Sequence, residues 1–381
     1  MVVNPIGERM MSKENQRQFS SLETLRFFAS LIIVVFHYTH YIGQHDWFKG
    51  YLAVDLFFVL SGFVITVAYQ TRIDSARLYG TFLKKRFARL YPLHLFTLLL
   101  YLAIGLAATR GMLHLDNSSK YNLHEFFYNL TLTHAWGFAH GFSFNTVSWS
   151  ISAEFAAYLL FPLILWLMNR GLTPGIIILL ALYSSAILFA TYVVHIPLTQ
   201  LAWQVGAARA LPAFALGVWL RLYLPAISSR LSKRMAIGLF YLSLILFTTT
   251  IIFSFNDYLG MVAASALVML AAINDTMGQS HVISHPFLSR RGELTYSLYM
   301  VHPIIATVFI TGIFLRFLGR SPIVVYGSIF TTFAIAFVLS TLCYKHFELP
   351  LQRWVLQLGQ GKNIPELSVT STSNLPTPDR I

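Results

Sequence analysis

The sequence predicts an all-α integral membrane protein in which about ten transmembrane helices form one bundle and both termini are cytoplasmic. The composition, a series of long apolar runs, and the placement of Lys and Arg support this prediction. Hydrophobic residues make up 56% of the 381 residues and charged residues 11%, whereas about a quarter of the residues in a soluble domain are charged. So few charges cannot cover a protein surface in water, and lipid is therefore the expected solvent.

A transmembrane helix needs about 20 mostly apolar residues. The runs that meet this requirement are residues 24–42, 51–70, 91–109, 151–168, 174–193, 207–223, 236–255, 258–274, 294–315 and 323–344.

The Lys and Arg residues indicate the orientation of these helices, because cytoplasmic loops of membrane proteins are enriched in them. With a cytoplasmic N-terminus, 20 of the 27 Lys and Arg lie in cytoplasmic segments and 6 in outer segments, while Arg26 lies inside the first span. The net charge of +12 therefore reflects topology, and no nucleic-acid partner is expected. The predicted location is a bacterial inner membrane, which the chain crosses many times.

Residues 125–144 do not fit the pattern, because His134, His140 and other polar residues interrupt an otherwise apolar stretch. An eleventh span here would move every later basic loop to the outer side. We therefore expect an interfacial or re-entrant segment on the outer face.

The expected organisation is a cytoplasmic segment at 1–20, one transmembrane domain at 21–356 and a disordered cytoplasmic tail at 357–381. Residues 1–20 lack the apolar core of a cleavable signal peptide. Cys343 is the single cysteine, which excludes an internal disulfide and a Cys-rich metal site. No metal ligands are predicted.

The first span carries Arg26 and His37, eleven residues apart and on one helix face, about 16 Å apart along the axis. Charged groups inside spans are costly and normally face the bundle interior or a wet cavity. Two interpretations of His37 remain open: an interhelical hydrogen bond or a catalytic role.

Asp55 lies in the second span, on the same face as Gly62, where a glycine permits close helix approach. Asp55 is suited to accepting hydrogen bonds from a neighbouring helix, to pairing with a cation such as Arg26, or to orienting His37 as a carboxylate orients a catalytic base.

A basic segment after the second span contains Lys85, Arg86 and Arg89. The positive-inside rule alone explains a basic loop at this position. Two arginines three residues apart on one side of a short helix are also suited to binding phosphates in bidentate fashion.

Two later spans carry further polar groups. The fourth opens with Trp149, Ser150 and Glu154, where the tryptophan has the position of a membrane anchor. In the ninth span, Tyr299 and His302 lie on one face. Convergence of these groups on one polar cavity fits an enzyme or a transporter. Transporters commonly have broken helices at two corresponding positions, and the sequence shows no such pair.

The motifs together resemble the acyltransferase-3 family of bacterial membrane proteins, whose members O-acylate exopolysaccharides, O-antigen, peptidoglycan and other surface glycans. Phe155 stands where the family often has a second acidic residue, and Gly50 lies five residues before the motif aspartate. The resemblance rests on the ordered elements Arg26 with His37, Gly50 with Asp55 to Phe63, Arg86 with Arg89, Ser148 to Ser150 with Glu154, Tyr296 to Pro303, and Phe347 to Pro350.

This resemblance implies an O-acyltransferase, in the first place an O-acetyltransferase, with no permanently bound cofactor. Its co-substrate would be acetyl-CoA or another acyl-CoA on the cytoplasmic side. Its acceptor would be a hydroxyl of a cell-surface or lipid-linked glycan on the periplasmic side. A polytopic transporter or flippase of a polysaccharide assembly system is the alternative.

The resemblance also implies roles for the residues above. His37 would be the base or a transient acyl carrier, and Arg26 would guide the pantetheine end or stabilise the oxyanion. Arg86, Arg89 and Lys85 would hold CoA phosphates, and Asp55 or Glu154 would orient the histidine or the sugar. The residues assigned to acceptor binding are Trp149, Ser150, Tyr299 and His302.

Overall fold

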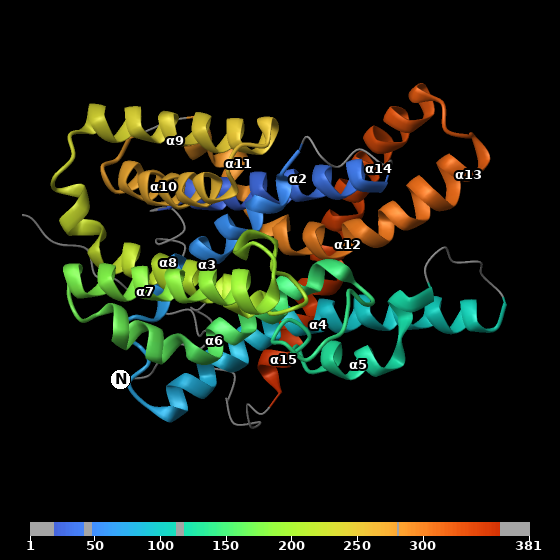
Figure 1. Cartoon of the computed structure of the whole chain (residues 1–381), viewed down its shortest axis with the longest axis horizontal. Coiled ribbons are helices and arrows are strands. Elements are labelled where there is room, and N and C mark those ends of the chain that lie inside the picture. The colour runs from blue at the N-terminus through green and yellow to red at the C-terminus, as the bar shows by residue number, and fades with distance from the viewer. Residues whose placement is uncertain (1–18, 42–47, 112–117, 280–281, 359–381) are drawn as a thin grey trace, which may run out of the picture.

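The computed structural model describes residues 19–41, 48–111, 118–279 and 282–358. All regular elements in these ranges are helical, and ten helices are long and apolar enough to cross a membrane. The prediction of an all-α membrane bundle with about ten spans is therefore confirmed. Figure 1 shows most of these helices running along the longest axis of the molecule.

The helical segments that form the spans are α2 (Ser20–Tyr41), α3 (Ala53–Tyr69) after η1 (Gly50–Leu52), α4 (Ala76–Thr109), α6 (Trp149–Met168) after η3 (Thr146–Ser148), α7 (Leu172–Phe189) with η4 (Ala190–Val194), α8 (Gly206–Ser228), α9 (Lys233–Phe253), α10 (Asp257–Thr276), α11 (Pro286–Ser289) with η7 (Arg290–Leu294), α12 (Thr295–Ala306), η8 (Thr307–Phe314) and α13 (Leu315–Phe317), and finally α14 (Pro322–Cys343) with η9 (Tyr344–Glu348) and α15 (Leu349–Gln357). Shorter elements are η2 (Ser118–Tyr121), α5 (Leu123–Leu130), η5 (Leu198–Gln200) and η6 (Val282–Ser284).

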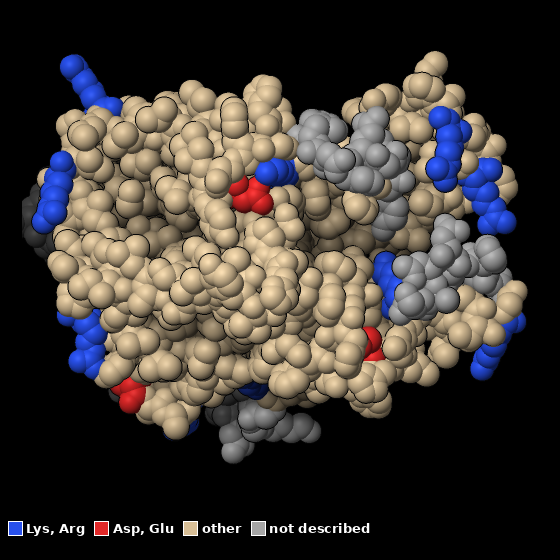
Figure 2. All heavy atoms as spheres, viewed as in Figure 1, with Lys and Arg blue, Asp and Glu red and all other residues tan. Residues whose placement is uncertain are grey.

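The surface is consistent with a lipid environment. In Figure 2, Lys and Arg lie mainly toward the two ends of the long axis, and most of the face between them carries no charge. Helix α3 is the most deeply buried span and α7 the least. Large apolar side chains of α7, such as Ile177, Leu180 and Leu188, are exposed, which is favourable only where the neighbour is lipid.

The short helix expected to carry Arg86 and Arg89 is not separate from the third span, which was predicted to begin at residue 91. Both arginines belong to α4, which has 34 residues and continues through Pro92. The residues Ala76–Leu90 are rich in Ala, Leu, Arg and Lys, which are strong helix formers, so the helix begins well before the apolar run. The last span is also longer than predicted, because helical structure continues from Pro322 to Gln357.

Residues 125–144 do not span the bundle, as predicted. They contain most of the eight-residue helix α5, which begins at Leu123, and a following loop, and eight residues cover only about 12 Å. The predicted segments 1–20 and 357–381 fall almost entirely outside the described residues.

Helices α3 and α8 approach each other closely at two glycines. A Cβ atom at Gly62 would lie 2.0 Å from the carbonyl oxygen of Phe214, and one at Gly217 would lie 2.1 Å from that of Val59. Two glycines on opposite helices therefore let the two backbones touch, as small residues do in membrane bundles. This confirms the close approach predicted at Gly62.

We expect Gly62→Ala to lower the free energy of unfolding by about 1–3 kcal/mol, the range for overpacking a tight interior, because the new methyl group meets a backbone carbonyl. Thermal unfolding of the detergent-solubilised protein measures this. Gly238→Ala on α9 is the control, because its Cβ would have no heavy atom within 4 Å. Equal stabilities of the two variants would contradict the close-packing interpretation.

The orientation of the bundle remains a prediction from the distribution of Lys and Arg. Alkaline phosphatase is active only outside the cytoplasm, and we expect it to be active when fused after Asn117. Green fluorescent protein fused after Gly359 should fluoresce, because that site is expected to be cytoplasmic. The reverse pattern would contradict the orientation.

Candidate active site

Two histidines meet between α2 and α12. His302 Nε2 lies 3.1 Å from His37 Nδ1, and the ring centroids are 5.0 Å apart. His302 is fully buried, and His37 is half-buried. Both residues were predicted as site residues, but the sequence did not indicate that they contact each other.

The backbone carbonyls around this pair determine the tautomers. His302 Nδ1 lies 3.1 Å from the Leu298 carbonyl oxygen, and His37 Nδ1 lies 2.9 Å from that of Ile33. Because a carbonyl oxygen only accepts, each Nδ1 carries a proton when its ring is neutral. His302 Nε2 then accepts from His37 Nδ1–H, which leaves the lone pair of His37 on Nε2.

A cavity of about 110 Å³ lies between α2, α3, α4, α6 and α12, and neither His37 nor His302 is among the residues that line it. This volume is room for a few water molecules. The polar residues of its lining are Arg26, Ser61, Arg89, Ser150, Glu154, Tyr158, Thr295, Tyr296 and Tyr299. The cavity thus brings together five of the predicted site residues.

Glu154 lies on the α6 wall of the cavity. Its Oε1 accepts hydrogen bonds of 2.5 Å from the hydroxyls of Ser61 and Tyr158. One turn away, Ser150 Oγ lies 2.7 Å from the hydroxyl of Tyr299. Ser150 and Glu154 are four residues apart on α6 and therefore share a helix face, as predicted. Both side chains line the cavity.

Tyr299 connects the cavity to the histidines. It lines the cavity, and its ring centroid lies 6.0 Å from that of His302. Along α12, Tyr296, Tyr299 and His302 follow one another at three-residue steps of about 4.5 Å. The helix therefore leads from the arginine end of the cavity, at Tyr296, to the histidine pair.

Two guanidinium groups line the cavity. Arg26 makes an ion pair with Glu23 on its own helix, at 3.2 Å. Arg89 makes an ion pair of 2.5 Å with Glu348 and lies over the ring of Tyr296. Two arginines from helices far apart in sequence, α2 and α4, thus both line the cavity.

Glu348 is a residue whose role was not predicted. It is 2% exposed, and besides Arg89 it accepts a hydrogen bond of 2.5 Å from Ser297 on α12. It therefore joins η9, α4 and α12 at the arginine end of the cavity. The signal in the sequence was the segment Phe347 to Pro350, which carried the family resemblance but no assigned role.

The other basic residues of α4 do not line the cavity. Arg86 is buried, with its guanidinium 5.3 Å from the centroid of the Tyr69 ring and 5.9 Å from that of Phe82. Lys85 is half-buried. Arg86 and Arg89 therefore occupy different environments, although three residues apart on one helix.

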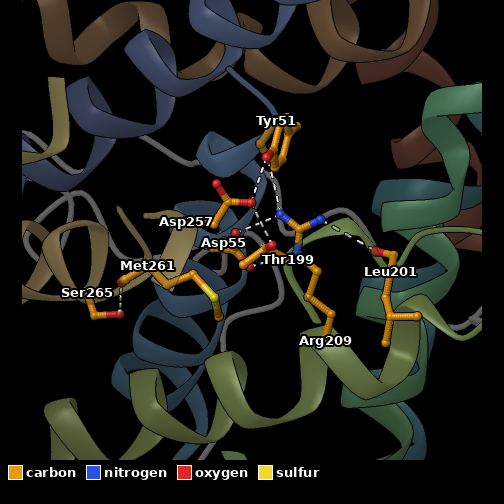
Figure 3. A network of polar contacts seen from close by, with 8 residues as sticks. All are labelled: Tyr51, Asp55, Thr199, Leu201, Arg209, Asp257, Met261 and Ser265. Atoms are coloured by element: carbon orange, nitrogen blue, oxygen red, sulfur yellow. Dashed lines mark hydrogen bonds and ion pairs between the residues drawn. The ribbon is translucent and has the colours of Figure 1, made fainter. Parts of the chain in front are cut away.

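Asp55 is paired with Arg209, which lies in the first turn of α8 (Figure 3). The guanidinium donates to both carboxylate oxygens, at 2.9 and 2.7 Å, and both residues are 2% exposed. Of the roles predicted for Asp55, accepting hydrogen bonds from a neighbouring helix is the one observed, and the partner is Arg209 rather than Arg26 or His37.

The ion pair belongs to a larger polar network, shown in Figure 3. Arg209 also donates to the Tyr51 carbonyl oxygen at 3.1 Å. The Tyr51 hydroxyl donates to Asp257 at 2.7 Å, and Thr199 donates to the same carboxylate at 2.9 Å. This network joins α3, α8 and α10 and buries the charge of Asp55.

Trp149 is buried and does not line the cavity. Its ring packs edge-on against Phe58, and the Arg209 guanidinium lies 5.6 Å from its centroid. Gly206 makes room for this ring, since a Cβ there would lie 2.6 Å from it.

Hydrogen bonds join the segment after α5 to α12 and to η3. Asn145 donates to the Met300 carbonyl oxygen on α12 at 3.0 Å. His134 Nε2 lies 3.1 Å from Ser148 Oγ, and its ring stacks on that of His94. Burial lowers the pKa of His134 to about 3, so this contact is neutral at physiological pH.

Lys120 of η2 lies close to an aromatic ring of α4. Lys120 Nζ is 4.9 Å from the centroid of the Tyr101 ring. Burial lowers the pKa of Lys120 to about 8, because desolvation disfavours its charged form.

The profile of a family described as an acyltransferase domain matches residues 19–341. Acyltransferase MdmB of Streptomyces mycarofaciens is 29% identical over 321 residues, which are 74% of this chain and 77% of that protein. Nodulation protein 10 of Rhizobium leguminosarum bv. viciae is 24% identical over 311 residues, 75% of this chain and 82% of that protein.

O-acetyltransferase OatA of Staphylococcus aureus is 25% identical over 378 residues, covering 91% of this chain but 59% of the relative. No solved structure matches the chain significantly. The family match includes α2, α3, α4, α6 and α12, which together form the cavity. The chain is a multi-pass membrane protein that belongs to this acyltransferase family.

Proposed function

We propose that the protein is an O-acyltransferase of a bacterial inner membrane that transfers an acyl group from acyl-CoA to a hydroxyl of a cell-surface or lipid-linked glycan. The observation that carries the proposal is the His37–His302 pair, which Tyr299 connects to a cavity lined by two arginines. Acyl transfer from a thioester to an alcohol needs a base for the hydroxyl and positive groups for the developing oxyanion. His37 is suited to the role of the base, and the two arginines give the cavity positive charge.

His37 is the proposed base. Its Nδ1–H is held by the Ile33 carbonyl oxygen and by His302 Nε2, which leaves Nε2 as the proton acceptor. His302 acts as a positioning residue, since it contacts His37 rather than the reacting atoms. A fully buried ring held by a backbone carbonyl is suited to keeping a base in one orientation.

The arginines suggest where the donor enters. CoA carries several phosphate charges, and guanidinium groups bind phosphate in bidentate fashion. Arg89 is held by Glu348 at 2.5 Å, so its position is established before the donor binds. Arg26 lies on the same cavity, closer along α2 to the expected cytoplasmic end than His37.

The transfer balances without a further reagent. The acceptor hydroxyl gives its proton to His37 Nε2 as its oxygen attacks the thioester carbonyl carbon. The C–S bond then breaks, an ester bond remains on the acceptor, and the CoA thiolate takes up a proton. Arg26 lies about 16 Å from His37 along α2, so Arg26 and Arg89 are suited to hold the phosphates of the donor rather than its reacting carbonyl.

The function as a whole is tested by NMR of surface polysaccharides from a deletion strain. The expected result is the loss of one acyl-ester signal, restored by the wild-type gene, with unchanged polymer export. Lost export with normal acylation would instead support the transporter or flippase alternative.

For the catalytic role, we expect His37→Ala and His37→Gln to lower acyl transfer by about 10²–10⁴-fold, the usual contribution of general-base catalysis. Acyl-CoA binding should persist, because the arginines are intact. His302→Gln should lose less, since a glutamine oxygen can still accept from His37 Nδ1–H. Acyl-ester content of surface glycans, at equal expression of each variant, measures these effects.

A near-normal His37→Gln variant would show that His37 is only an interhelical hydrogen-bonding group. The chemistry would then have to lie elsewhere, and His302 would be the next residue to test.

For the donor site, we expect Arg89→Ala to weaken acyl-CoA binding about ten- to a hundredfold, which corresponds to a charge-assisted hydrogen bond of about 1.5–3 kcal/mol. Titration calorimetry of the purified protein measures the affinity. Arg77→Ala is the matched control, because Arg77 is an exposed arginine of the same helix.

Arg89→Ala also leaves the buried Glu348 without its cation, which destabilises a fold. The double variant Arg89→Ala/Glu348→Gln removes this buried charge and separates folding from binding. Wild-type affinity for acyl-CoA in that double variant would rule out Arg89 as a donor ligand.

A further inference from the structure

Three potential metal ligands meet at the beginning of α5, outside the cavity described above. His124 and Glu125 lie in the first turn of this helix, and His140 comes from the loop that follows it. One ligand atom from each lies within 4.8 Å of the other two. Within the described residues, no other group of three or more His, Cys, Asp or Glu side chains brings its ligand atoms this close together.

The distances suit a tetrahedral metal ion. His140 Nδ1 lies 3.0 Å from Glu125 Oε1, and His124 Nδ1 lies 4.0 Å from the same oxygen. Ligands about 2.0–2.1 Å from a tetrahedral Zn²⁺ are about 3.3 Å apart. Both imidazoles are mostly exposed and can therefore adjust by small side-chain rotations.

Glu125 supplies an independent indication of a cation. It is 4% exposed, and its Oε1 accepts a hydrogen bond of 3.2 Å from the His140 backbone N–H. Within the described residues, no protein donor reaches its buried Oε2. A buried carboxylate oxygen without a donor is costly, and a cation bound by both oxygens of Glu125 would remove this cost.

The ligand chemistry favours one class of metal. Two imidazoles and one carboxylate match the His₂Glu ligand set of open zinc sites, which leave one position for water or another ligand. Imidazole ligands favour Zn²⁺ and neighbouring transition ions over Mg²⁺ or Ca²⁺, which prefer oxygen.

We propose that His124, Glu125 and His140 bind one Zn²⁺ ion that ties the start of α5 to the loop after it. That loop also contains Ser143, which accepts a hydrogen bond from Asn129 on α5, and it leads to Asn145, which binds the backbone of α12. The metal would therefore hold the segment whose Asn145 donates a hydrogen bond to the backbone of α12. This proposal is independent of the acyl donor and acceptor.

The experiment uses the full chain, purified in detergent without a polyhistidine tag and freed of metal with a chelator. Titration calorimetry with Zn²⁺ should show one ion per chain. Glu125→Gln and His140→Ala should each weaken binding about a hundredfold or more, because even groups that only orient a metal ligand contribute about 10–100-fold. His195→Asn should bind normally, since His195 is an exposed histidine remote from this group in the sequence.

A second measurement guards against misfolding of a variant. Zn²⁺ should raise the Tm of the wild type and of His195→Asn, because a ligand that binds the folded state stabilises it. It should leave the Tm of His140→Ala unchanged. Absence of binding to the wild type, or wild-type affinity in both ligand variants, would overturn the proposal.

Discussion

A charge inside a membrane bundle must be matched by another protein group, because lipid offers neither water nor a counterion. The Asp55–Arg209 pair satisfies this requirement where α3 meets α8, the same two helices that Gly62 and Gly217 bring into backbone contact. Breaking such a pair from one side leaves a buried charge, which costs about 3–5 kcal/mol. The central helix α3 is thus held by one ion pair and by two glycines.

The same requirement shapes the site. Arg89 and Glu348 neutralise each other between α4 and η9, while Ser297 satisfies the second oxygen of Glu348. These contacts connect the end of the described chain to the cavity wall. Helices that are distant in sequence therefore meet at the groups proposed to act on the donor, and the ion pairs that stabilise the bundle also orient those groups.

The histidines meet the requirement in another way. Both rings can be neutral, and backbone carbonyls one turn before each of them accept their Nδ1 protons. A neutral pair needs no counterion and still offers a lone pair for proton transfer. A buried ionised base would need a partner, and that partner would compete with the acceptor hydroxyl.

Hydrophobic run length and helical periodicity were sufficient to predict much of this protein: the ten spans, the non-spanning segment at 125–144, the close approach at Gly62 and the shared face of Ser150 and Glu154. They could not predict which helices are neighbours. Tertiary structure alone paired Asp55 with Arg209, joined His37 to His302, placed Glu348 against Arg89, and packed Trp149 away from the cavity. The reason is physical: periodicity specifies the direction in which a side chain leaves its own helix, whereas its partner depends on the packing of helices up to 265 residues apart.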